Sequence, residues 1–189
     1  MLCEFLSPAS PPQLSDVAVV LAGRPERKRY GAQLFEQGLV RRLILSISRS
    51  EVRYTAALVP QVSDQLLELA RSTPPEQRHF FLDREGSSLR ITRAELRGSG
   101  TFYELTGLAK YLENAAGISS LMVVSTSIHL RRVRFCCQQI AFFRSKSVAY
   151  VAVPEEVSSF RPQGWWRHWG HWRYLGQEYV KLAAYRLLY

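Results

Sequence analysis

Four short runs of apolar residues are spaced along the chain and predict the strands of a buried β-sheet. The runs are rich in Val, Ile and Leu, which is typical of strands covered on both faces. They occupy residues 16–22, 43–47, 121–124 and 148–153.

Segments with apolar residues at helical spacing separate these runs. The predicted helices span residues 26–37, 62–71, 102–114, 129–143 and 174–188. Strands that alternate with helices form mostly parallel sheets with helices on both faces. The pattern therefore predicts an α/β fold, a three-layer α/β/α Rossmann-like domain.

Three segments depart from the alternation. Residues 78–94 contain two strand-like stretches around a Gly turn, which predicts a β-hairpin, either an insertion or an edge element. Residues 1–15 are rich in Pro and Ser and predict a loose N-terminal arm. The remaining residues, 16–189, are expected to form a single domain that ends in a Trp-rich segment, residues 164–189, whose second half is helical.

The chain is basic. Its 189 residues carry 25 Lys and Arg against 16 Asp and Glu, a formal net charge of +9, and 47% are hydrophobic, enough for an ordinary core. This balance suits an anionic partner: nucleic acid, a phosphate-bearing metabolite or an anionic membrane surface. The alternative is a basic protein with no polyanionic partner.

Cys3, Cys136 and Cys137 show neither a CxxC pair nor metal-ligand spacing. They favour a reducing compartment, with Cys136 and Cys137 as buried packing residues and no metal site. No run of about 18 apolar residues predicts a membrane span, and the N-terminus lacks the pattern of a signal peptide. We therefore expect a cytoplasmic protein, with peripheral membrane contact as the alternative.

The segment 121–132, LMVVSTSIHLRR, joins a predicted strand to a basic helix. Ligands of open α/β sheets bind at the carboxyl ends of strands, and a helix that begins there favours anions. Ser125, Thr126 and Arg132 are therefore candidate ligand-binding residues. His129 is a candidate general acid/base, kept neutral by the helix dipole. The alternative is a serine cap, a locally bonded histidine and solvated arginines.

A second candidate is the loop at residues 98–101, Gly-Ser-Gly-Thr, before a predicted helix. Ser99, Gly100 and Thr101 could bind an anion through backbone N–H groups and hydroxyls, with Glu104 as a secondary catalytic candidate. The alternative is a capping box, in which Thr101 and Glu104 only close the helix start.

The third candidate follows the first predicted strand, where Gly23 and Arg24 begin a basic run. Neither GxGxxG nor a P-loop motif is present, so this is no dinucleotide or Walker fingerprint. The run could supply cations to a phosphate or carboxylate, or it could be a solvated face. GxSxG and HExxH motifs are also absent, and no carboxylate pair suggests a glycosidase.

The fourth candidate is the aromatic and basic tail, which holds all four tryptophans: Trp165, Trp166, Trp169 and Trp172. Tryptophan beside arginine suits a membrane interface or base stacking. The alternative is that the tryptophans pack the last helix onto the sheet. Glu178 and Lys181 are spaced as a surface ion pair.

Together these motifs resemble the ElyC/SanA/YdcF family, a domain of unknown function, as a divergent branch. Residues 16–23 match its D-x-I-V-V-L-G strand. The polar positions of its V-T-S-x-x-H-x-x-R motif are occupied by Ser125, Thr126, His129 and Arg132. Arg29, Ala32, Leu34 and Gly38 match its first helix, and the family also ends in a helix with Glu and Lys. Ser46-Ile47-Ser48 stands where the family has Ser-Gly-Gly. In the E-x-x-S-x-N-T-x-E-N motif, Glu95 and Thr101 match, Gly98 and Gly100 replace Ser and Asn, and Glu104 falls one place late.

The resemblance implies a Rossmann-like fold with a polar pocket at the strand ends and no settled activity. Bacterial members are associated with cell-envelope biogenesis, many with an N-terminal membrane anchor, and S-adenosylmethionine or another nucleotide-like ligand is an implied cofactor. The leading hypothesis is a protein that binds a small anionic or nucleotide-like ligand, as a hydrolase or transferase of phosphorylated or envelope-precursor substrates. The alternative is a non-catalytic peripheral membrane or regulatory module that uses the Trp-rich tail. Nucleic acid is the least favoured partner.

Overall fold

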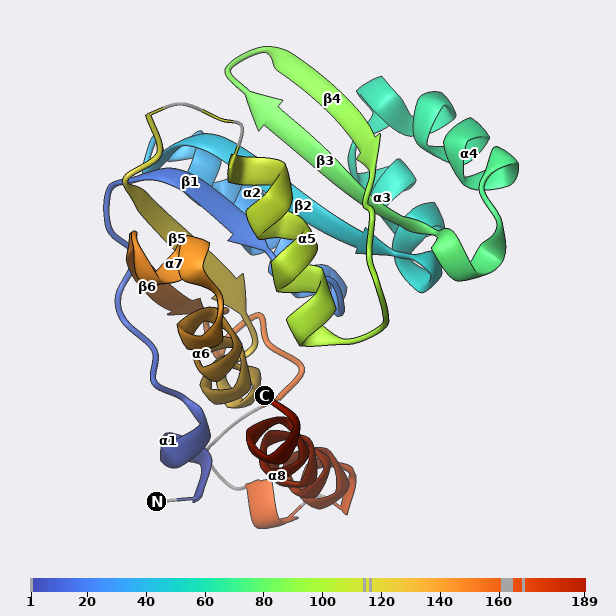
Figure 1. Ribbon diagram of the computed structural model, residues 1–189. Coiled ribbons are helices and arrows are strands. Elements are labelled where there is room, and N and C mark those ends of the chain that lie inside the picture. The colour runs from blue at the N-terminus through green and yellow to red at the C-terminus, as the bar shows by residue number, and fades with distance from the viewer. Residues whose placement is uncertain (1, 114, 116, 161–164, 168) are drawn as a thin grey trace.

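The computed structural model describes residues 2–113, 115, 117–160, 165–167 and 169–189. Six strands form one mixed, mostly parallel sheet in the order β4-β3-β2-β1-β5-β6 (Figure 1). The parallel strands are β1 (Ser15–Val20), β2 (Val40–Ser48), β5 (Ser120–Ser125) and β6 (Ser147–Ala152). The chain leaves β1 toward β2 on one side and returns to β5 on the other. Crevices for ligands form at such a reversal of strand order, outside the carboxyl ends of the strands.

The hairpin expected for residues 78–94 is an edge of this same sheet. Strand β3 (His79–Glu85) pairs antiparallel with β2, and β4 (Ser88–Arg93) pairs antiparallel with β3. The hairpin therefore extends the sheet, and the start of β3 lies beside the carboxyl end of β2, where His79 pairs with Ser48.

Helices cover both faces of the sheet, so the predicted α/β class is confirmed. On one face lie α2 (Pro25–Glu36), α3 (Val52–Leu58) and α4 (Ser63–Ser72). On the other face lie α5 (Thr101–Glu113), α6 (Leu130–Gln139) and α7 (Ala141–Arg144). In β1, Ala18 and Val20 join the first core, whereas Val17 and Val19 join the second. Burial on both faces explains the uninterrupted apolar run of this strand.

A third core lies between the two ends of the chain and the start of α6. Helix α1 (Leu2–Leu6) contributes Cys3 and Leu6, and α8 (Trp169–Leu188) contributes Leu175 and Leu182. Figure 1 shows both helices beside α6, on the side of the sheet where the parallel strands end. The first residues of the chain thus differ from the loose arm expected for 1–15, because α1 buries two apolar side chains.

The observed elements also differ from the sequence prediction elsewhere in the chain. Helix α3 was not predicted, and α8 begins at Trp169, before residue 174. The helix expected over 129–143 is divided at Ile140, whose φ of −103° and ψ of 120° are extended. The structure also contains short 3-10 turns: η1 (Arg49–Glu51), η2 (Pro60–Val62), η3 (Pro75–Gln77), η4 (Ser127–His129) and η5 (Trp165–Arg167).

Within the described residues, no helix has the length and apolar character needed to cross a membrane.

Candidate functional site

An open cleft of about 1720 Å³ lies at the carboxyl ends of β1 and β2. The loop after β1, the turn η1 after β2, the 98–101 loop, η4 and α8 all contribute to its walls. Buried polar side chains form much of its lining, and seven of them are less than a tenth exposed: Arg27, Glu51, Thr101, Glu104, His129, Arg132 and Glu178. Behind them lie three further buried polar residues that hydrogen-bond to this lining: Lys28, Ser125 and Thr126. Such a concentration of buried polar groups marks this region of the sheet as the candidate site.

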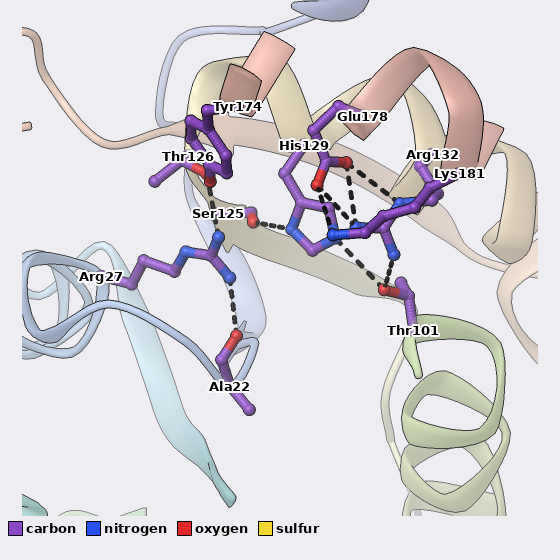
Figure 2. A network of polar contacts seen from close by, with 10 residues as sticks. All are labelled: Ala22, Arg27, Thr101, Ser125, Thr126, His129, Arg132, Tyr174, Glu178 and Lys181. Carbon is purple, nitrogen blue, oxygen red and sulfur yellow. Dashed lines mark hydrogen bonds and ion pairs between the residues drawn. The ribbon is translucent and has the colours of Figure 1, made fainter. Parts of the chain in front are cut away.

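His129 lies in the cleft between the start of α5 and the end of β5, and contacts a hydroxyl from each. Its Nδ1 atom lies 2.7 Å from Ser125 Oγ, and its Nε2 atom lies 3.2 Å from Thr101 Oγ1 (Figure 2). Burial, together with the charges of Arg132, Arg27 and Lys181, holds the pKa of His129 well below its usual value. The imidazole is therefore neutral, and burial is the largest cause. A neutral ring between two hydroxyls can take a proton at one nitrogen and release one at the other.

Arg132 is bound by a carboxylate from α8. Its guanidinium donates to both oxygens of Glu178 at 2.9–3.1 Å, and it also donates to Thr101 Oγ1. Lys181 Nζ lies 3.4 Å from the same carboxylate. The expected pair of Glu178 and Lys181 therefore forms, but Glu178 is only 3% exposed, so it is not a pair of two surface side chains. Figure 2 shows that this ion pair also fixes the Thr101 hydroxyl beside His129. Arg132 therefore has its charge balanced within the protein.

Arg27, unlike Arg132, has only neutral hydrogen-bond partners. It donates to the Ala22 carbonyl at 2.7 Å and to Thr126 Oγ1 at 2.9 Å, and both acceptors are neutral. The side chain is 4% exposed, and its Nε–H has no partner. Among the described residues, no carboxylate forms an ion pair with Arg27. The carboxylates of Glu104, Glu51 and Glu178 act on this guanidinium only over longer distances, by Coulomb attraction. A buried guanidinium with an unpaired N–H and no direct ion pair is a place where an anion from outside the protein can bind.

Lys28 in α2 and Glu51 in η1 connect the segments that follow β1 and β2. Lys28 is fully buried and donates to Glu51. The same carboxylate accepts hydrogen bonds from the backbone N–H of Gly23 at 2.9 Å and from that of Ser48 at 3.0 Å. The loop after β1 is therefore held in place by a residue of η1.

Thr101 and Glu104 do not close the start of α5 as a capping box. The Glu104 carboxylate accepts a hydrogen bond from the Ala22 backbone N–H at 2.7 Å, and the Thr101 hydroxyl contacts His129 and Arg132. Both side chains therefore reach across the cleft, and the capping alternative is wrong. Glu104 positions the loop after β1.

The remaining predicted residues lie on the walls and rim. Ser99 and Gly100 are exposed at the cleft mouth, and the guanidinium of Arg24 lies 5.0 Å from the centre of the Tyr174 ring. Gly23 has φ of +138°, and a Cβ atom there would lie 2.7 Å from the Arg27 guanidinium. Glycine at position 23 therefore lets the backbone pass over Arg27.

The tail packs only in part. Of the Trp-rich segment, residues 165–167 and 169–189 are described, and Trp165 is partly buried against the third core. Trp166, Trp169 and Trp172 are exposed. Trp165 therefore packs against the third core, between the two ends of the chain, whereas the packing alternative placed the tryptophans against the sheet.

Sequence reasoning did not identify Glu51, His79 or Glu178 as residues of the cleft. It included Arg27 and Lys28 only as members of the basic run after the first strand. His79 Nε2 lies 2.7 Å from Ser46 Oγ, and burial lowers the pKa of the ring. A signal existed for Glu51, because Ser48 and Glu51 have capping-box spacing, and both halves of that box form. Arg27 and Lys28 lie in a charged run in which sequence gives no sign of burial.

Comparisons with protein-family models, with curated proteins and with solved structures gave no match. No group of three or more His, Cys, Asp or Glu suited to a metal ion occurs in the described part of the chain. The function is therefore argued from the cleft itself.

Proposed function

We propose that this protein binds a small phosphate-bearing anion, such as a nucleotide-like molecule, in the cleft at the ends of β1, β2 and β5. The observation that carries the proposal is Arg27, a buried guanidinium with neutral protein partners and one unused N–H. A phosphate oxygen accepts strong hydrogen bonds from a guanidinium, so a phosphate would satisfy the unused N–H and give Arg27 a direct anionic partner.

Two further features support an anion. Helix α5 begins at Thr101 on the cleft wall, and helix starts favour negative charge. Basic side chains also surround the mouth, where steering of an anionic ligand is strongest. These residues are Arg24, Arg49, Arg78, Arg93 and Arg97.

The position of His129 suits proton transfer beside the bound anion, so hydrolase or transferase activity on a phosphorylated substrate is part of the proposal. In hydrolysis, Nε2 accepts the proton of the attacking water, and the imidazolium returns a proton to the leaving oxygen. Thr101 and Ser125 hold the ring through its two nitrogens.

The binding step is tested by thermal unfolding with inorganic phosphate, pyrophosphate, a nucleoside diphosphate and S-adenosylmethionine, and with the uncharged nucleoside as the control ligand. A ligand at a hundred times its Kd stabilises the folded state by about 2.7 kcal/mol and raises Tm by a few degrees. We expect this rise for the phosphate compounds in the wild type and in the exposed control Arg29→Gln. Arg27→Gln should abolish it. A phosphate-dependent rise that Arg27→Gln leaves intact, or no rise with any phosphate compound, overturns the proposal.

A further inference from the structure

Helix α8 has one face in the protein and an apolar face in solvent. The inner face consists of Leu175, Glu178 and Leu182, each less than 5% exposed. On the opposite side, Trp169 is 83% exposed, Val180 70% and Leu187 87%. These three residues are spaced by 11 and 7 positions, about three and two helical turns, so they form one line along the helix. A line of large apolar side chains exposed to solvent indicates a surface that binds a membrane or another protein.

The exposed side chains of this region carry charge of one sign. Arg167 and Arg173 are exposed next to Trp166 and Trp172, and Arg186 is exposed near the end of α8. Within described residues 165–189, the only side-chain carboxylate is Glu178, which is buried against Arg132. The outer surface of α8 therefore combines tryptophan, aliphatic residues and arginine without acidic side chains.

We propose that the outer face of α8, together with the Trp165–Arg167 turn, docks on the surface of an anionic lipid bilayer. Tryptophan is favoured at the depth of lipid headgroups, and arginine is attracted to anionic lipids. Since α8 is not apolar enough to cross a membrane, it lies along the surface. A second copy of the chain is a poorer occupant, because docking two such faces would bring arginines of like charge together.

Docking would place the cleft close to the bilayer. Tyr174 and Glu178 of α8 line the cleft, and Figure 2 shows them directed toward Thr126 and Arg132. Trp169 and Leu187 are exposed on the opposite side of the same helix. The proposal is independent of phosphate binding, because none of the outer-face residues contributes to the cleft.

Intrinsic fluorescence gives a direct test, because all four tryptophans lie within residues 165–172. The full chain is mixed with vesicles of phosphatidylcholine, alone or with phosphatidylglycerol, and is followed by tryptophan emission and by co-sedimentation. We expect a blue shift and sedimentation with the anionic vesicles, weakened by salt. The double variant Trp169→Ser/Leu187→Ser should weaken binding at least tenfold. The control Leu14→Ser/Val157→Ser changes two exposed apolar residues elsewhere and should bind as the wild type does.

The charge contribution is tested with Arg167→Gln/Arg173→Gln, which should lower affinity about fivefold for each arginine. Arg53→Gln/Arg71→Gln, on α3 and α4, removes the same charge elsewhere and should have a smaller effect. Absence of sedimentation with anionic vesicles overturns the proposal, as does binding that the Trp169→Ser/Leu187→Ser variant leaves unchanged. A wild-type dimer in sedimentation velocity that this variant dissociates, without any lipid binding, would assign the face to a second copy.

Discussion

The carboxylate of Glu178 in α8 receives three hydrogen bonds, at 2.9–3.1 Å, from the guanidinium of Arg132 in α6. Both side chains are buried, so removal of one leaves an uncompensated charge in the interior. Glu178→Ala should lower the free energy of unfolding by about 3–5 kcal/mol, measured by urea denaturation. Arg132→Met/Glu178→Leu, which removes both charges, should be less destabilised than Glu178→Ala.

The control for this pair is Glu95 and Lys110, an ion pair of 2.8 Å in which both side chains are about 70% exposed. Because solvent screens exposed pairs, Glu95→Ala should have a far smaller effect on unfolding. Equal destabilisation by Glu178→Ala and Glu95→Ala would contradict the buried role of Glu178.

At Gly23, the addition of a single Cβ atom should impair both stability and phosphate binding. Gly23→Ala places a Cβ 2.7 Å from the Arg27 guanidinium and imposes a φ of +138° on alanine. Such backbone strain costs about 1–3 kcal/mol, and displacement of Arg27 should also remove the thermal shift produced by phosphate. Gly38→Ala is the matched control, because its φ is +73° and nothing lies within 4 Å of the added Cβ. It should lower Tm but retain the shift, and loss of the shift in both variants would argue against a specific role for Gly23.

The sheet could be predicted from sequence because its central strands are buried on both faces. Val17 to Val20 alternate between two cores, which forces an apolar residue at every position. The apolar pattern in the sequence is weaker for elements that are only partly buried. Helix α1 is short, and it shares its buried core with Ile128 and Leu175, which are far away in the sequence. Local composition therefore favoured a loose arm where tertiary packing forms a helix.

The candidate site could be predicted only in part. The expectation that ligands bind at strand ends identified Ser125, Thr126 and His129, because Ser125 ends β5 and the other two lie in the turn that follows. Sequence could not show that Glu178 reaches Arg132 across 46 positions, or that Arg27 turns inward from a charged run. Those contacts depend on how α2 and α8 pack in the fold. The spacing of charged residues in a helical sequence is the same whether they face solvent or a cleft, so it does not predict which of them are buried.

The three cysteines should be inert in the native protein. Cys3, Cys136 and Cys137 are free and buried, and burial raises the pKa of Cys136 to about 12 and that of Cys137 higher still. Because the thiolate is the reactive form, a thiol reagent should label none of them quickly under native conditions. All three should react in denaturant. Rapid labelling of one native thiol would contradict this, and Cys3→Ser would show whether α1 is its source.

Stability should fall when the pH drops below about 6.5, because His129 and His79 resist protonation in the folded state. Burial is the largest cause for both rings, and it lowers the folded pKa below the unfolded value. The unfolded chain therefore binds more protons in this range, so the free energy of unfolding rises with pH and is lost as the pH falls. Each histidine contributes up to about 1.4 kcal/mol per pH unit.

Urea denaturation of the wild type, His129→Gln and His79→Gln between pH 7.5 and pH 5 measures these slopes, in a range where most carboxylates remain ionised. Each single variant should have a shallower slope than the wild type, with the larger reduction for His129→Gln, whose imidazole is the more deeply buried. The double variant should be nearly independent of pH. If His129→Gln retains the full wild-type slope, the ring is not held neutral, and its proposed role as a proton acceptor at the cleft floor fails with it.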